Sequence, residues 1–125
     1  MKNYRKVMSA SSLSGDEVYN TQGEYLGTIE DFMLDLETGR IAYAVLSFGG
    51  IMGMGKKLCA VPPKMLMLNE KDRCFTLDAD KERLQRAPGF DKENWPDMTK
   101  ENFAADIRGF YGGAQEHSEP AKRGY

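Results

Sequence analysis

Short apolar runs separated by turn-forming residues occupy the chain from Gly15 to about Asp78, and this alternation constrains the fold most strongly. Each run has the length of a β-strand. The expected strands cover residues 17–20, 25–36, 40–48, 57–61, 65–68 and 73–77. Six short strands in so short a segment are typical of a small barrel or a pair of packed sheets, because closure removes exposed sheet edges. The sequence therefore predicts an all-β core in the form of a small six-stranded β-barrel.

The strand over residues 25–36 changes phase along its length. Phe32, Leu34 and Leu36 share one face, but the apolar residues before them do not continue that alternation. We expect a β-bulge near Glu30 and Asp31, which would also bend the strand. The next strand is apolar on both faces, and this predicts a central strand that is covered on both sides.

Helical signals replace strand signals after Asp78. Residues 80–87 predict a short helix, and a second helix is expected from about 100 to 111, with Thr99 as its N-cap and an end at Gly112 and Gly113. The expected organisation is a flexible N-terminal lead-in (1–14), the barrel domain (15–80), a helical C-terminal extension (81–113) and a disordered tail (114–125).

A glycine-rich connection follows the third expected strand. GIMGMGK at 50–56 matches the first seven positions of a phosphate-binding P-loop, but Lys57 stands where Ser or Thr is required. A strand ending at Pro62 follows instead of the helix that would help bind phosphate. The segment carries apolar side chains where a loop is normally polar, and this favours a self-association interface formed by Ile51, Met52 and Met54. The alternatives are that these side chains fold back onto their own core or contact a different protein.

Aromatic and aliphatic residues of the second helix form a second candidate interface. Phe103, Ile107 and Phe110 lie on one stripe at helical spacing. With Trp95 and Tyr111, such residues typically anchor an appendage to its core or to a partner subunit. The sequence leaves open whether this helix packs on its own barrel or on that of a neighbour.

Residues suited to catalysis are few. The acidic residues of the second strand and its turn, which are Glu30, Asp31, Asp35 and Glu37, favour a solvated face. Asp31 and Asp35 have the same parity but lie about 13 Å apart by strand rise, too far to share one ion. The only histidine, His117, belongs to the polar tail, and Cys59 and Cys74 are expected to be free thiols in strands, too widely spaced for a zinc site. We expect no catalytic residues, no cofactor and no metal, so the chain is not predicted to be an enzyme.

Charge and hydropathy exclude two further classes. The chain has 17 basic and 19 acidic residues, a net charge of −2 and a pI near 5.5, which argues against a dedicated nucleic-acid-binding protein. The sequence predicts no transmembrane helix, no secretory signal and therefore a cytoplasmic location without membrane insertion.

Four segments resemble the PRC-barrel family, stand-alone type. They are GDEVYN at 15–20, GEYLGTIED at 23–31, DLETGRIAYAVLS at 35–47 and GGIMGMGKKLCAVP at 49–62, within a resemblance that covers about residues 8–80. The segments NWP at 94–96 and FYG at 110–112 are also similar to tails of some stand-alone members. The resemblance implies a six-stranded β-barrel like that of the photosynthetic reaction centre H subunit and of a ribosome maturation factor that binds a ribosomal protein. It implies protein docking and frequent dimerisation, and no catalytic residues that could be mapped here.

The expected function is that of a non-enzymatic barrel that self-associates as a homodimer and docks onto a protein partner. One alternative is an accessory factor in ribosome or RNA maturation, acting through a protein contact or through Lys56, Lys57 and Lys64. Another is an enzyme that binds an ion or small ligand on the acidic strand.

Overall fold

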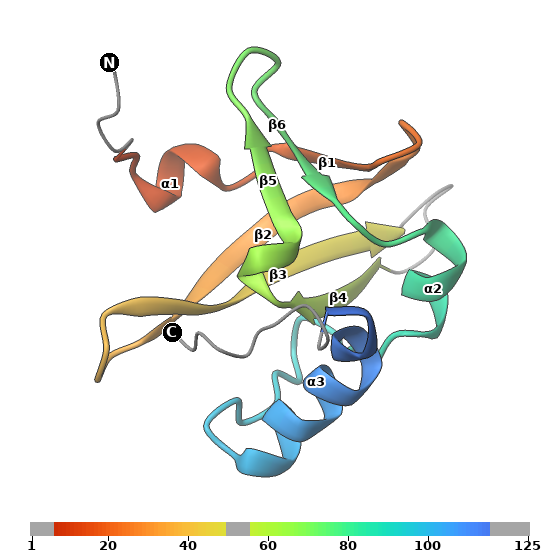
Figure 1. The fold of residues 1–125 in the computed structure, drawn as a ribbon. Coiled ribbons are helices and arrows are strands. Elements are labelled where there is room, and N and C mark those ends of the chain that lie inside the picture. The colour runs from red at the N-terminus through yellow and green to blue at the C-terminus, as the bar shows by residue number, and fades with distance from the viewer. Residues whose placement is uncertain (1–6, 50–55, 116–125) are drawn as a thin grey trace.

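One mixed sheet of six strands forms the body of the molecule in the computed structural model, which describes residues 7–49 and 56–115 (Figure 1). Its order is β4-β3-β2-β1-β6-β5; β1 and β6 run parallel, and the other neighbours are antiparallel. The strands are β1 (Glu17–Asn20), β2 (Tyr25–Asp35), β3 (Arg40–Gly49), β4 (Lys56–Val61), β5 (Leu66–Asn69) and β6 (Cys74–Leu77). The helices are α1 (Ala10–Leu13), the 3-10 turn η2 (Pro63–Met65), α2 (Lys81–Arg86) and α3 (Glu101–Gln115). All six predicted strands are confirmed, and β3 is central, between β2 and β4.

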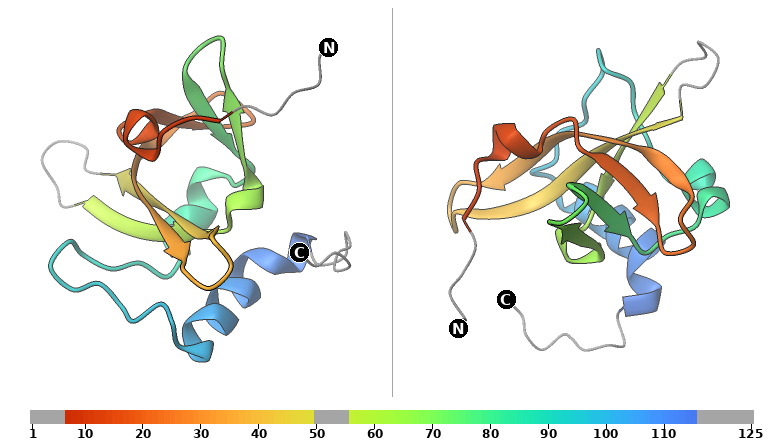
Figure 2. Two further views of the ribbon diagram at one scale, coloured as in Figure 1. Left: turned by 90° about the vertical axis from the view of Figure 1, so that its left-hand side faces the viewer. Right: turned by 90° about the horizontal axis from the view of Figure 1, so that it is seen from above.

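The sheet curls around the core but does not close, so the expected closed barrel is wrong (Figure 2). Within residues 7–49 and 56–115, β4 and β5 are the two outer strands and do not pair with each other. Pro62 and Pro63 follow β4 without a backbone donor, and η2 then turns the chain away from it. The outer edge of β4 pairs instead with the C-terminal extension: the Leu58 amide donates to the Phe90 carbonyl and the Phe90 amide to the Leu58 carbonyl, each at 2.9 Å.

Two irregularities bend the β2–β3 hairpin. Ile29 pairs with Leu46 but Asp31 pairs with Val45, so Glu30 is the extra residue and the predicted bulge is confirmed. A second register shift between Met33 and Leu34, which the sequence analysis did not predict, leaves Ala42 of β3 without a partner. Beyond this point the hairpin projects from the rest of the sheet (Figure 1).

Helix α3 packs on its own chain, which decides the question that the sequence left open. Ile107 is 3% exposed and Tyr111 is fully buried, and both belong to the same core as Leu46, Cys59 and Leu84. The helix lies beside β4. Its predicted end at residues 112–113 is wrong, because the helix continues through both glycines to Gln115.

The segment before β1 is more ordered than the expected lead-in. Ala10–Leu13 forms one helical turn, in which the Ser9 hydroxyl accepts a hydrogen bond from the Ser12 amide at 3.1 Å. Leu13 packs against the core, and the Arg73 guanidinium donates to the Ser12 carbonyl at 3.3 Å. At the other end, residues 114 and 115 of the expected tail belong to α3, and residues 116–125 lie outside the described part.

Candidate functional site

Only one of the two predicted interface groups, the one on α3, lies within the described residues. Ile51, Met52 and Met54 lie outside the described residues, so the Gly-Met connection stays a prediction. On α3, the Phe103 ring packs edge-on against Tyr43, with 5.3 Å between ring centroids. The Arg83 guanidinium lies over the Phe110 ring, 5.5 Å from the ring centroid, and Ile107 is in the core. With α3 in this position, these three side chains contact their own chain, and an intermolecular role for them stays a prediction.

The acidic residues of β2 and its turn do not converge on one point. Asp35 accepts hydrogen bonds from the amides of Glu37 and Thr38 at 2.9 and 3.4 Å, and Asp31 accepts one from the Phe32 amide at 2.8 Å. Glu30 lies 3.9 Å from the Lys92 ammonium. Within the part of the chain that the structure describes, no group of three or more His, Cys, Asp or Glu residues could hold a metal ion.

Both cysteines are free thiols, as predicted. Cys59 is fully buried, while Cys74 is only half-buried. Burial raises the pKa of the Cys59 thiol to about 11, because the thiolate loses its hydration, and the Lys57 ammonium offsets this only in part. A thiol that stays protonated at neutral pH is a poor nucleophile, so Cys59 is a core residue.

Lys57, one of the three basic residues considered for RNA binding, is engaged within its own chain. The Lys57 ammonium donates to the carbonyls of Gln85 and Ala87, each at 2.9 Å. These carbonyls lie at the end of α2, where a cation is favourable. Lys57 therefore joins β4 to the C-terminal extension, and this weakens the alternative in which it binds RNA.

Several apolar side chains of the β2–β3 hairpin are exposed. The alternation in the sequence placed them on strand faces but did not indicate their exposure. Leu36 is 88% exposed, Leu34 58% and Ile41 44%; we call these three the hairpin surface. The signal that could have revealed it is strand length. β2 has 11 residues but β1 has only four, and β1 pairs with β2 no further along than Thr28, so within the described residues no strand pairs with the end of β2 on that side. Isolated exposed leucines are ordinary, but a group of them on a projecting hairpin is typical of an interaction site.

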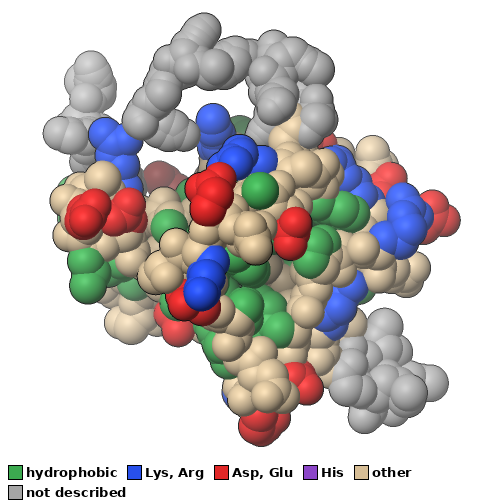
Figure 3. Space-filling model, turned by 90° about the horizontal axis from the view of Figure 1, so that it is seen from below, with side chains coloured by type: hydrophobic (Ala, Val, Ile, Leu, Met, Phe, Trp, Pro, Cys, Tyr) green, Lys and Arg blue, Asp and Glu red, His purple; other side chains and the backbone are tan. Residues whose placement is uncertain are grey.

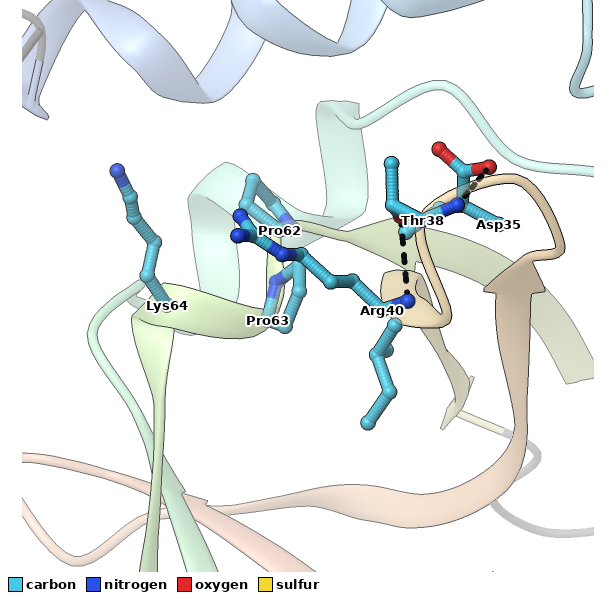
Figure 4. A pocket seen from close by; sticks show the side chains of 8 residues that line it. Asp35, Thr38, Arg40, Pro62, Pro63 and Lys64 are labelled. Atoms are coloured by element: carbon cyan, nitrogen blue, oxygen red, sulfur yellow. Dashed lines mark hydrogen bonds between the residues drawn. The ribbon is translucent and has the colours of Figure 1, made fainter. Parts of the chain in front are cut away.

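Two hollows flank the hairpin. The first, of about 600 Å³, lies between the hairpin turn and the end of β4, and Arg40 extends across it toward Pro62 and Pro63 (Figure 4). It combines charges of both signs, from Asp35, Arg40 and Lys64.

The second hollow, of about 730 Å³, separates the other side of the hairpin from the segment that precedes α3; we call it the hairpin groove. It is lined by Met33, Leu34, Asp35, Leu36, Glu37, Ala42, Tyr43, Pro96, Asp97, Met98 and Thr99. Seen from below, the molecule presents hydrophobic side chains interspersed with acidic and basic ones (Figure 3). Such a surface offers contact area and charge to a partner.

Comparison with known proteins supports one assignment. The family model described as PRC-barrel domain matches residues 5–84. No curated protein matches the chain significantly. In the described ranges, none of the helices has the length and apolarity needed to cross a bilayer. The matched residues extend from before α1 through all six strands to α2, so the chain belongs to the PRC-barrel domain family.

Proposed function

We propose that this chain is a non-enzymatic, cytoplasmic protein-interaction domain, which self-associates as a homodimer and docks onto a second protein. The observation that carries the proposal is the hairpin surface, because Leu34, Leu36 and Ile41 are exposed together on an element that projects from the sheet. Burying apolar side chains of this size contributes about 1.5–3 kcal/mol each, enough for a few of them to hold a partner.

The two associations are assigned to opposite ends of the molecule. The hairpin turn lies at the Arg40 end of β3, and the Gly-Met connection follows Gly49 at the other end. A ten-residue strand spans about 30 Å, so a dimer formed around the connection leaves the hairpin free. Ile51, Met52 and Met54 are therefore the proposed dimer contacts, and the hairpin is the proposed docking site for the second protein.

Light scattering coupled to size exclusion, over a dilution series, tests the self-association. We expect the wild-type chain to be a dimer at low micromolar concentration and Met54→Asp to be a monomer, because a carboxylate buried in an apolar interface loses its hydration. Met67→Asp is the matched control, since Met67 is 68% exposed on β5 and belongs to neither proposed set of contacts. A monomeric wild type would refute self-association, and a dimeric Met54→Asp variant would refute the assigned contacts.

A further inference from the structure

The hairpin groove has an apolar floor that can adapt to what it binds. Met33 of β2 and Met98 of the segment before α3 both line it, together with Tyr43 and Pro96. Methionine side chains are unbranched and polarizable, so they adjust to ligands of different shape. Leu36 stands at the rim, almost fully exposed.

The charged residues of the groove all have the same sign. Asp35, Glu37 and Asp97 line it, and no lysine or arginine is among the described residues that do so. Asp97 accepts hydrogen bonds from the Thr99 hydroxyl at 2.5 Å and from the Thr99 amide at 3.0 Å. These bonds lower the pKa of the Asp97 carboxyl below its ordinary value, so it stays negative at neutral and mildly acidic pH.

We propose that the hairpin groove binds a short segment of a partner protein that carries apolar anchor residues together with lysine or arginine. The apolar floor would bury the anchors, and the three carboxylates would pair with the cations and set the orientation of the segment. This inference deepens the proposed function and depends on it. A nucleic-acid partner is disfavoured, because its phosphates would face three carboxylates and no lining cation.

The hollow on the other side of the hairpin is less selective. Arg40 and Lys64 line it together with Asp35, so charges of both signs are present there, with one more positive than negative. Of the two hollows, only the hairpin groove therefore has the excess of negative charge that would select a cationic segment.

Fluorescence anisotropy with labelled synthetic peptides tests the proposal on the full chain. The probe is a peptide of roughly twelve residues with leucine at every third or fourth position and lysine elsewhere; a second peptide has glutamate in place of lysine. We expect the lysine peptide to bind, with an affinity that falls as salt rises from about 50 to 300 mM, and the glutamate peptide not to bind.

Matched variants distinguish binding in the groove from a general attraction of the lysine peptide to an acidic protein. The combination Asp35→Asn, Glu37→Gln and Asp97→Asn removes three charges but keeps the oxygens that accept the turn hydrogen bonds, and we expect affinity to fall about tenfold or more. The control combination Glu70→Gln, Asp72→Asn and Glu82→Gln changes net charge equally at other sites, and its affinity is expected to stay within about twofold.

Leu36→Ser is expected to weaken binding several-fold, and Met67→Ser to leave it unchanged. Circular dichroism confirms that each variant is folded.

Five outcomes would overturn the inference: no binding of the lysine peptide, equal binding of the two peptides, equal losses in the two charge combinations, direct binding of labelled single-stranded RNA that weakens in the groove variants, or a change of oligomer mass in Leu36→Ser. The last would mean that a second copy of the chain occupies the groove. If the peptides fail while the wild-type dimer persists, the groove assignment is wrong and self-association stands. A monomeric wild type refutes self-association whatever the peptides do.

Discussion

Gly27 occupies a position in the sheet that has no room for a side chain. It pairs with Val18 of β1 on one side and with Phe48 of β3 on the other. Its φ of 154° is one that residues with a Cβ rarely adopt, and an added Cβ would lie 1.9 Å from the Ser47 carbonyl oxygen. A contact so close to backbone cannot be relieved by rotating a side chain, so β1, β2 and β3 meet here only because the residue is glycine.

We therefore expect Gly27→Ala to lower the free energy of unfolding by roughly 3 kcal/mol or more, through overlap and backbone strain together. Gly23→Ala is the matched control. Gly23 has a φ of 85° but nothing within 4 Å of the added Cβ, so only the conformational cost of about 1–2 kcal/mol applies. Urea denaturation measures both. Similar losses in the two variants would show that the sheet moves to accommodate the methyl group.

At the scale of elements, Arg83 joins the two C-terminal helices. Its guanidinium donates to the carbonyls of Phe110 at 3.0 Å and Tyr111 at 3.4 Å, and it lies 5.5 and 5.8 Å from the centroids of their rings. α2 is only six residues long and needs such tertiary contacts to be stable. One side chain therefore fixes the position of α2 against α3.

Arg83→Ala is expected to reduce stability by about 1–3 kcal/mol, because two carbonyls lose a charged donor and two rings lose a cation. Arg86→Ala, at an exposed position of the same helix, is expected to cost less than about 0.5 kcal/mol. Hydrogen exchange measures the local effect, and faster exchange in the last turns of α3 is expected only in Arg83→Ala. Unchanged protection there would contradict the bridging role.

At the scale of the whole molecule, the sheet and the C-terminal extension share one core. Tyr111 of α3 is fully buried with Cys59 of β4 and Leu84 of α2 in the same cluster. Trp95 packs on Phe90, whose backbone extends the edge of β4. The extension therefore fills the side of the curled sheet that strand pairing leaves open.

Tyr111→Ala is accordingly expected to cost roughly 3–5 kcal/mol for the entire domain. Circular dichroism and Trp95 fluorescence are expected to report a single coincident transition. Tyr111→Phe is the matched control: the buried hydroxyl has no hydrogen-bond partner among the described residues, so removing it is expected to change stability by less than about 1 kcal/mol or to raise it. A fluorescence transition that precedes the loss of circular dichroism would show that the extension unfolds separately.

Local sequence patterns were sufficient to predict the six strands and the family. The strands and the Glu30 bulge follow from apolar alternation, which depends only on neighbouring residues, and the family match confirms the resemblance read from the glycine and Val-Pro pattern. The sequence did not predict the second bulge at Ala42 or the helical turn before β1, where the local pattern carries no clear signal.

Three features emerged only from the packing of the folded chain: the sheet stays open, α3 packs on its own chain and the hairpin surface is exposed. Alternation shows which residues share a face of a strand, and it does not show whether another element covers that face. Leu34 and Leu36 have the pattern of core residues but lie beyond the end of β1, whereas Ile107 and Tyr111 have the same apolar character and are buried against β4. Coverage depends on contacts between residues far apart in the chain, and these are set when the whole domain packs.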